Sequence, residues 1–200
     1  MAKFTSIKLF DGYSACFRQW KYVSKKKKKK KKKSTSYAVI LYALIVMKKY
    51  QSNKLFDGYS TCFRQWKADG THCKYLHGYA VSFRVWFEGE LDHRNWVWDF
   101  GGMKRSKTQI HGMSPKDYFA FLLDHTTVVA IDDPYMDKFQ QMDADGIIQL
   151  RILPATGCEK FAEHLYYVIN NFLDEETDGR VRATRVEVYE HERNSASYGE

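Results

Sequence analysis

The sequence lacks several features that are typical of exported and membrane proteins. Its 200 residues include only four cysteines, and their spacing is not that of a disulfide framework. No apolar core of a signal peptide follows Met1. The longest apolar run, residues 37–47, has eleven residues, whereas a membrane-spanning helix needs about 20. We therefore expect reduced thiols and a cytoplasmic protein.

A net positive charge is also absent outside one segment. The formal net charge is +8, but the nine consecutive lysines from Lys25 to Lys33 contribute +9. Without them the net charge of the chain would be −1. The sequence pI of about 9.2 therefore describes this run and not the rest of the protein. The run can attract nucleic acid or an anionic membrane surface by charge alone, and we expect no such partner for the remainder of the chain.

The first part of the chain is a partial repeat. Residues 1–21 recur at 47–67 with a constant offset of 46, and both copies begin with methionine. Two partial copies are too few to stack into a solenoid. We interpret residues 1–46 as a partial duplicate of the N-terminus joined to the lysine run and an apolar linker, outside the core fold. Residues 47–200 then form a single domain.

Alternation and capping signals after the repeat predict an α+β fold. Ser114, followed by Pro115 and by Asp117 three residues on, is typical of a helix N-terminus. Apolar residues from Cys158 to Phe172 fall on one helical face. We expect helices at about 115–124 and 158–173, and strands at 50–65 (irregular at Asp57-Gly58), 77–88, 96–100, 147–153, 180–190 and 196–198. This order predicts an antiparallel four-stranded sheet with two helices packed on one face.

Residues that can carry chemistry gather between 62 and 87. Cys73 precedes an alternating run in which His77, Tyr79 and the apolar residues up to Phe87 share one parity, and therefore one face of a strand. A strand that begins with polar groups and continues with apolar ones has its polar end at a site. Two interpretations are open for Cys73 and His77: a reactive or metal-binding pair, or a packed cysteine and a hydrogen-bonded core histidine.

Five short motifs follow one another in the order found in one enzyme family. They are Cys73-x-x-x-His77-Gly78, Gly89 with Asp99-Phe100, Leu123-Asp124-His125, Glu159 at a helix start, and Val188-Tyr189-Glu190. In these motifs the chain resembles the 6-pyruvoyltetrahydropterin synthase family, which includes the 6-carboxytetrahydropterin synthases of the queuosine pathway. The resemblance implies the tunnelling fold, in which several copies, usually six, join their sheets into a homo-oligomer with active sites between subunits.

The resemblance also implies a lyase that acts on 7,8-dihydroneopterin triphosphate. In the family, a zinc ion held by three histidines polarises hydroxyls of the substrate side chain, while a cysteine and an Asp–His pair move protons. The matching catalytic residues here are Cys73, Asp124 and His125. The resemblance assigns pterin binding to Glu190 and Glu159.

Each of these residues has a structural alternative. His125 suits the C-terminal end of a helix and Glu159 suits a helix N-terminus, because both positions complement the helix dipole. Glu190 shares strand parity with apolar neighbours, so its carboxylate is expected on an inward face. It can bind the N–H edge of a pterin there, or it can form an ion pair with Arg182 or Arg185.

The match is incomplete at the metal site. His77 stands at the position of the second zinc ligand, but Tyr79 replaces the third, and Cys62 stands eleven residues before Cys73, where the first ligand is expected. Cysteine thiolate is a good zinc ligand, whereas tyrosine, with an ordinary pKa near 10, is a poor one. Three interpretations follow: zinc on Cys62, His77 and either Tyr79 or His72; a thiol-rich site of Cys62, Cys73 and His77; or loss of the metal.

We predict a 6-carboxytetrahydropterin synthase-like lyase, because the spacing of Cys73 and His77 is more similar to that of the queuosine branch. The alternatives are a 6-pyruvoyltetrahydropterin synthase, and a non-catalytic pterin- or purine-binding protein that has lost the metal site.

Overall fold

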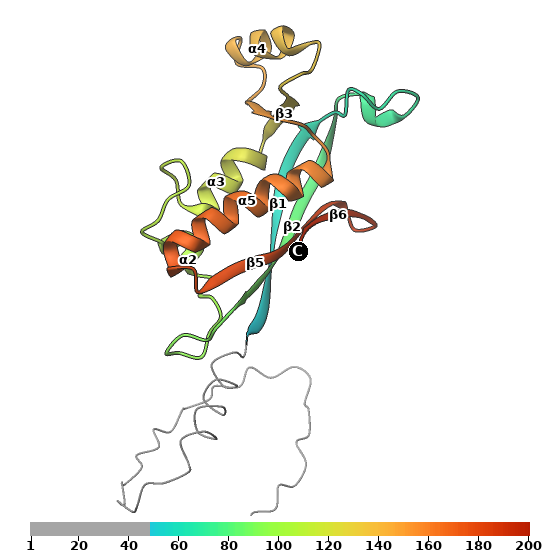
Figure 1. Ribbon diagram of the computed structural model, residues 1–200. Coiled ribbons are helices and arrows are strands. Elements are labelled where there is room, and N and C mark those ends of the chain that lie inside the picture. The colour runs from blue at the N-terminus through green and yellow to red at the C-terminus, as the bar shows by residue number, and fades with distance from the viewer. Residues whose placement is uncertain (1–48) are drawn as a thin grey trace, which may run out of the picture. The chain divides into compact units, whose positions relative to one another are not determined.

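The computed structural model describes residues 49–200, which form one β-sheet with helices packed against it (Figure 1). The partial duplicate, the lysine run and the apolar linker predicted at 1–46 lie outside the described residues. The strands are β1 Tyr50–Phe63, β2 His77–Gly89, β3 Thr126–Ala130, β4 Leu150–Leu153, β5 Val181–His191 and β6 Asn194–Gly199. Their order across the sheet is β4-β3-β1-β2-β5-β6.

Helices connect these strands. They are the 3-10 turn η1 His72–Lys74, α2 Gly102–Arg105, α3 Pro115–Leu123, α4 Met136–Ala144 and α5 Cys158–Thr177. α3 and α5 cover one face of the sheet, while α4 lies with β3 and β4 beyond the end of β1 (Figure 1). None of the helices in residues 49–200 is long and apolar enough to cross a membrane.

The predicted α+β class is confirmed, but the sheet is larger than predicted and mixed. β1, β2, β5 and β6 pair in the expected antiparallel manner. β3 and β4 add two parallel strands at the C-terminal end of β1. All five residues of β3 are buried, and only two residues separate this strand from α3. A fully buried strand has no alternation, so its sequence carried no strand signal.

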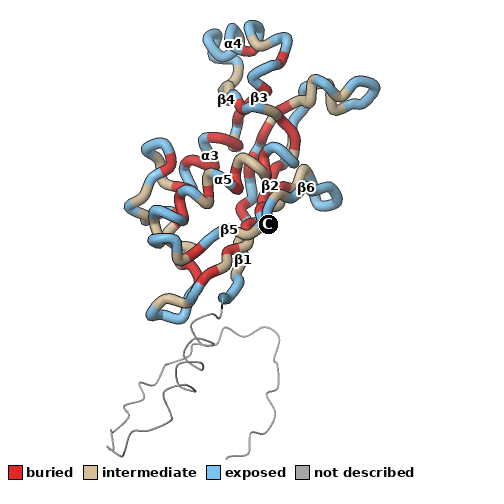
Figure 2. Tube along the Cα trace, in the orientation of Figure 1, coloured by how far each residue is buried: buried red, intermediate tan, exposed pale blue. Residues whose placement is uncertain are grey.

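The core forms where the predicted face of β2 meets the two long helices. Val81, Phe83, Val85 and Phe87 are at most 1% exposed, which confirms the predicted shared face. Phe119 of α3 packs edge-on against Phe83, with ring centroids 5.1 Å apart. Buried residues line both the sheet and the helices at this contact (Figure 2). Each such side chain contributes about 1.5–3 kcal/mol by leaving water, so this layer holds the strands in place.

Both helix predictions are confirmed at their N-terminal ends. Ser114 Oγ accepts a hydrogen bond from the backbone N–H of Asp117 at 3.2 Å, the expected cap of α3. α5 begins at Cys158 as expected and continues four residues beyond the predicted end. It stops where Asp178 takes a left-handed conformation with φ 51°.

β1 has the irregularity that was predicted at Asp57-Gly58. The pairing register with β2 shifts between Phe56 and Tyr59, and Gly58 has φ 85°, a conformation that glycine adopts without strain. β3 pairs only with residues 61–63 of β1. In the described part of the chain, the rest of this edge of β1, from Tyr50 to Ser60, therefore has no neighbouring strand.

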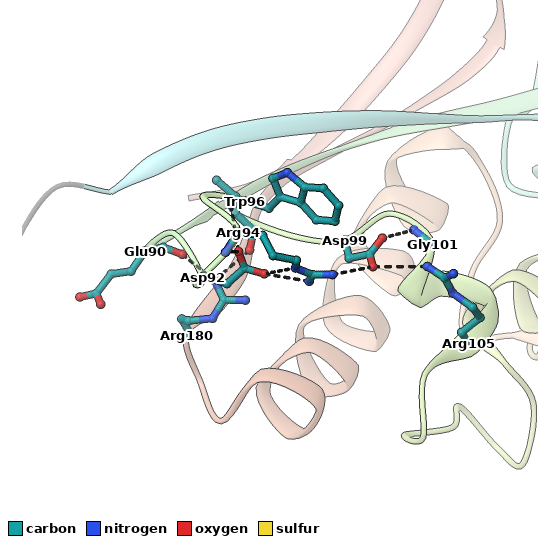
Figure 3. Close-up of polar contacts among 9 residues, drawn as sticks. Glu90, Asp92, Arg94, Trp96, Asp99, Gly101, Arg105 and Arg180 are labelled. Carbon is teal, nitrogen blue, oxygen red and sulfur yellow. Dashed lines mark hydrogen bonds and ion pairs between the residues drawn. The ribbon is translucent and has the colours of Figure 1, made fainter. Parts of the chain in front are cut away.

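The strand predicted at 96–100 is wrong. These residues belong to the loop between β2 and α2, where Asp92 Oδ1 accepts backbone hydrogen bonds from Arg94 at 2.8 Å and Trp96 at 3.0 Å (Figure 3). These bonds turn the backbone and prevent an extended conformation. The strand predicted at 147–153 forms only over β4, and α4 occupies the stretch before it.

Candidate functional site

A small cavity brings together three of the residues singled out from the sequence. It measures about 160 Å³ and lies where the end of β1, the η1 turn, the start of α5 and the β5–β6 turn meet. The lining residues that matter below are Cys73, Cys158, Glu159, Glu190 and Asn194. We call this cavity the acidic pocket, because it contains two carboxylates and no lysine or arginine.

Cys73 is held in the acidic pocket by backbone contacts. The N–H of Gln65, just after β1, donates to the carbonyl oxygen of Cys73 at 2.8 Å. Thr71 caps the η1 turn by accepting from the N–H of Cys73 at 3.3 Å. Gly157 lies against the end of the Gln65 side chain and has φ 115°, a conformation that residues with a side chain rarely adopt. This glycine therefore allows the start of α5 to approach the turn that carries Cys73.

Glu190 points into the acidic pocket without a cationic partner. Val186 and Val188, which share its parity on β5, are fully buried, and Glu190 itself is half-buried. Arg182 pairs with Glu88 and Glu200, and Arg185 pairs with Glu187. No cation within residues 49–200 lies at ion-pair distance from Glu190. The ion pair considered as a structural alternative is therefore not formed, and the carboxylate is available to a ligand.

The charge of Glu190 is felt by its neighbours. Burial, and then the charges of Glu190 and Glu159, raise the pKa of the Cys158 thiol from 9.0 to about 12. Burial and Glu190 also raise the pKa of Tyr79. A helix N-terminus usually lowers a thiol pKa, but at the first residue of α5 burial and the two carboxylates outweigh the helix dipole. Cys158 is consequently a neutral thiol at physiological pH.

The three predicted metal ligands do not converge, because Cys62 lies apart from His77 and Tyr79. In the antiparallel pairing of β1 and β2, Cys62 stands opposite Gly78, and Phe63 stands opposite His77. Opposed residues share a face, so Cys62 lies on the face away from His77 and Tyr79, and Phe63 lies on theirs. Burial raises the pKa of the Cys62 thiol, which further disfavours a thiolate there.

Tyr79 and His77 instead bond to each other. The hydroxyl of Tyr79 lies 2.7 Å from Nε2 of His77. The ring of Phe63 stacks on Tyr79 with centroids 4.2 Å apart and an interplanar angle of 18°. An aromatic stack thus occupies the side of the strand pair on which His77 lies.

Asp124 and His125 form a hydrogen-bonded pair outside the acidic pocket. Nδ1 of His125 lies 2.9 Å from Oδ1 of Asp124, and the same oxygen accepts from the backbone N–H of Ser60 at 3.2 Å. His125 has φ 55°, and 77% of its side chain is exposed. The carboxylate orients the imidazole as a relay pair requires, but neither residue lines the pocket that contains Cys73.

Comparison with known proteins identifies the family of the chain. The family model of 6-pyruvoyl tetrahydropterin synthase matches residues 54–200. The chain belongs to the 6-pyruvoyl tetrahydropterin synthase family.

Solved structures agree on the fold. An uncharacterised protein from Wolinella succinogenes has a TM-score of 0.61 at 20% identity, covering 76% of this chain and 98% of the other. The 6-pyruvoyl tetrahydropterin synthase of Caenorhabditis elegans has a TM-score of 0.50 at 13% identity, covering 77% of this chain and 97% of the other. No curated protein matches the chain. The predicted family is therefore confirmed, and these two likenesses, at such low identity, bear on the fold alone.

The residues present do not fit the three-histidine zinc site of the synthase family. The side of the strand pair that carries His77 offers one imidazole, a phenol and a phenylalanine ring. Phenylalanine has no donor atom, and the tyrosine hydroxyl already bonds to His77. Across residues 49–200, no group of three or more His, Cys, Asp or Glu side chains is arranged to hold a metal ion. We therefore derive no chemistry through zinc.

Two residues that fix this site were not identified from the sequence. Arg64 forms a two-pronged ion pair with Asp133, with N–O distances of 2.8 and 2.6 Å, and the Asp133 side chain is 1% exposed. Arg64 also reaches the carbonyl oxygen of Lys74 at 3.5 Å and stacks on Tyr135. The pair thus ties the end of β1 and the η1 turn to the β3–α4 corner. Asp133 carried only a turn signal in the sequence, beside Pro134.

Proposed function

We propose that this synthase-family chain binds a pterin ring in the acidic pocket, with the Glu190 carboxylate accepting hydrogen bonds from the amino and ring N–H groups of the pterin. The observation that carries this proposal is a half-buried carboxylate without a cationic partner in the described chain. Such a group is costly to leave unpaired, and a forked N–H edge satisfies it as an arginine would.

The size and polarity of the acidic pocket support a flat, uncharged ring. Its volume of about 160 Å³ is small beside ligand pockets of roughly 300–1,000 Å³, so only the ring enters and a side chain stays outside. The neutral thiol of Cys158 and the side-chain amide of Asn194, which donates to Glu190 at 3.5 Å, add polar contacts without adding charge. Two carboxylates repel phosphate, so the substituent that carries a phosphate must point out of the pocket.

A second candidate function is catalysis, because Cys73 lines the same cavity as Glu190. This function is a 6-carboxytetrahydropterin synthase-like lyase that converts 7,8-dihydroneopterin triphosphate to a 6-substituted tetrahydropterin, within queuosine or tetrahydropterin biosynthesis. Product formation of the 6-pyruvoyl type is the alternative. Cys73 would remove a proton from the substrate side chain at the point where that side chain extends out of the pocket.

The proton relay of this lyase requires another copy of the chain. Asp124 and His125 lie outside the acidic pocket of their own chain, so they can serve only a pocket presented by a neighbour. The free edge of β1 beside Ser60 offers a surface where a neighbouring sheet can pair. We therefore include a homo-oligomer, a hexamer as in the tunnelling fold, in the proposal. The three free cysteines in residues 49–200 fit a reducing compartment such as the cytoplasm.

The test is a calorimetric titration of the full chain with 7,8-dihydroneopterin. Glu190→Gln removes the acceptor charge but keeps the shape, and should weaken binding by about tenfold to a hundredfold. The matched control is Glu88→Gln on β2, whose partners Lys49 and Arg182 do not line the pocket. Equal affinities in the two variants would refute the proposed role of Glu190.

Turnover separates binding from catalysis. The full chain is incubated with 7,8-dihydroneopterin triphosphate, and the products are separated by chromatography and identified by mass spectrometry. Cys73→Ala should abolish product formation and leave the affinity for 7,8-dihydroneopterin within a factor of about two. Tight binding without any product from the unmodified chain would leave the non-catalytic pterin-binding protein as the function.

A further inference from the structure

Tyr79 stands at the position of a family zinc ligand, and it lies beside the carboxylate proposed to bind the pterin. Phe83 of β2 pairs with Val188 of β5. Tyr79 and Glu190 follow these two residues on the same face of their strands, so the register places them diagonally across the strand pair. Such neighbours lie about 7–8 Å apart, within reach of an aromatic side chain. The Tyr79 hydroxyl donates a hydrogen bond to the Glu190 carboxylate across this gap.

The same hydroxyl is supported from its other side by His77. It lies 2.7 Å from Nε2 of His77. A phenol has a single proton, and an ionised carboxylate can only accept. Because Tyr79 gives its proton to Glu190, it accepts from His77, and the imidazole proton of this contact belongs to Nε2. His77, Tyr79 and Glu190 thus form one chain of hydrogen bonds that ends at the acidic pocket.

The ring of Tyr79 is held in place by the core. Phe63 stacks on it with centroids 4.2 Å apart, and Phe63 itself packs edge-on against Phe161 of α5 at 4.9 Å. Phe63 is 2% exposed, and it also lines the acidic pocket. A tyrosine ring packed in this way has little rotational freedom. The hydroxyl therefore reaches Glu190 from a fixed point.

Two side-chain donors within residues 49–200 contact the Glu190 carboxylate. They are the hydroxyl of Tyr79 and the amide of Asn194, which is 3.5 Å away. A carboxylate has about four acceptor positions, so two remain for a ligand. A forked N–H edge requires both carboxylate oxygens to lie in its own plane. The orientation of Glu190, and not its charge alone, therefore decides which rings fit.

We propose that Tyr79 is a positioning residue that orients the Glu190 carboxylate and thereby makes the acidic pocket selective for rings with an amino group beside a ring N–H. The inference rests on the pterin binding proposed above and adds the cause of its selectivity. A ring with an oxygen in place of the amino group turns an acceptor toward the oriented carboxylate, and the two repel. In this chain, the position of a family zinc ligand thus serves ring recognition.

The probes are pterin and lumazine, which carry an amino group and an oxygen, respectively, at the same ring carbon. Each is titrated calorimetrically into the full chain. Tyr79→Phe keeps the ring stacked on Phe63 and removes only the hydroxyl. It should weaken pterin binding by about tenfold and lower the preference for pterin over lumazine by a similar factor.

The matched control is Tyr189→Phe. It removes the hydroxyl of the residue next to Glu190, which lies on the opposite face of β5 and pairs with Ser82. Both affinities should change less than about twofold. An equal loss in the two tyrosine variants would overturn the proposal, because a hydroxyl on the far face cannot orient the carboxylate.

A double-mutant cycle separates positioning from a general structural effect. In a Glu190→Gln background, Tyr79→Phe should change pterin affinity less than about twofold, because no carboxylate remains to be oriented. If Tyr79 only stabilised the fold, its loss would weaken binding by the same factor in both backgrounds. That result would overturn the positioning role.

The variants also distinguish this inference from the function on which it rests. Unchanged pterin affinity in Glu190→Gln would refute pterin binding at Glu190, and the role of Tyr79 with it. A loss of about tenfold in Glu190→Gln, together with an unchanged affinity and an unchanged preference in Tyr79→Phe, would refute the role of Tyr79 alone.

Discussion

The acidic pocket and the basic basin both adjoin β1 but are built in different ways. The basic basin is a cavity of about 590 Å³ between the edge of β1, α2 and the start of α3, with four cationic lining residues: Lys54, Lys104, Arg105 and Lys116. In the acidic pocket, buried backbone contacts fix the thiols and carboxylates, and close packing raises the pKa of Cys158 to about 12. In the basic basin, the charges end flexible side chains, and only Lys54 and Arg105 are held by neighbours. The first arrangement selects the hydrogen-bonding edge of one ring, whereas the second lies along the edge of β1 that a neighbouring sheet covers in the proposed oligomer.

The two cavities also differ in their relation to the family. The acidic pocket contains the residues that resemble the family motifs, Cys73, Glu159 and Glu190, but lacks the zinc donors beside His77. Asp99 and Phe100, which match another motif, shape the basic basin instead. A motif in the sequence thus indicates the fold around it and does not by itself assign the residue to the catalytic pocket.

The largest effect we expect is the creation of a metal site in the acidic half of the molecule. Phe63, His77 and Tyr79 share one face, so Phe63→His with Tyr79→His places three imidazoles together. Elemental analysis should then find about one zinc per chain, because three histidines suffice for an open zinc site.

The matched control changes the register and not the composition. Cys62→His with Tyr79→His also gives three imidazoles, but one lies on the opposite face, so no stoichiometric zinc should be retained. Phe63 is 2% exposed, so circular dichroism must show that its variant is folded. If the first double variant unfolds, the single variant Tyr79→His is measured instead. It offers two imidazoles on one face, so it should bind zinc, but more weakly than a three-histidine site. Stoichiometric zinc in the control pair would contradict the pairing of β1 with β2.

The next largest effect concerns the frame of the acidic pocket. Asp133→Ala leaves the half-buried Arg64 without its partner, and should lower the free energy of unfolding by about 2–3 kcal/mol. Asp132→Ala, at the neighbouring exposed pair with Lys67, should cost less than about 1 kcal/mol. Urea denaturation measures both. Equal costs would show that the Arg64 pair is no more buried in solution than the surface pair.

Much of the fold could be predicted from the sequence because its signals are local. The alternating face of β2, the Ser114 cap and the apolar face of α5 are each visible within a few residues. β3 gave no such signal, because a strand buried on both faces does not alternate. The short loop strand at 96–100 was predicted wrongly because aromatic residues favour strands, and the hydrogen bonds of Asp92 override that preference.

The candidate site was predictable only in its residues and not in its geometry. The sequence spacing placed Cys62 at a ligand position, whereas the strand pairing turns it to the other face and presents Phe63. A shift of one residue exchanges the two faces of a strand, so counting along a loop of uncertain length cannot decide which one faces the site. The Arg64–Asp133 pair spans 69 residues and had no local signature at all.

A smaller effect tests whether the two cavities are independent. Glu190→Gln should weaken binding of 7,8-dihydroneopterin by about tenfold or more. Lys54→Met should leave this affinity within about twofold, because the two cavities share no residue. Calorimetric titration measures both. An equal loss in the two variants would mean that one continuous site, or a site shared between subunits, binds the pterin.

The smallest expected effect is a change in the reactivity of Cys158. Burial is the largest cause of its raised pKa, and the charges of Glu190 and Glu159 add to it, so Glu190→Gln should lower that pKa only in part. Alkylation by iodoacetamide between pH 8 and 10, followed by mass spectrometry of the peptide that contains Cys158, should be slow in the unmodified chain and faster in the variant. Glu88→Gln, which does not line the pocket, should not change the rate.

The Cys158 thiol also makes the free energy of unfolding depend on pH in the alkaline range. Its pKa is about 12 when folded, against an ordinary value of 9.0, so the folded state retains a proton that the unfolded state loses. The contribution of this thiol to stability is therefore complete below about pH 9 and decreases as the pH rises toward 12. Glu190→Gln should narrow this window from its upper end, because the folded pKa falls while the unfolded one does not. Urea midpoints at pH 10 and pH 11.5 measure the slope near the upper end of this window, and an unchanged slope together with an unchanged alkylation rate would mean that the Glu190 carboxylate does not face Cys158 in solution.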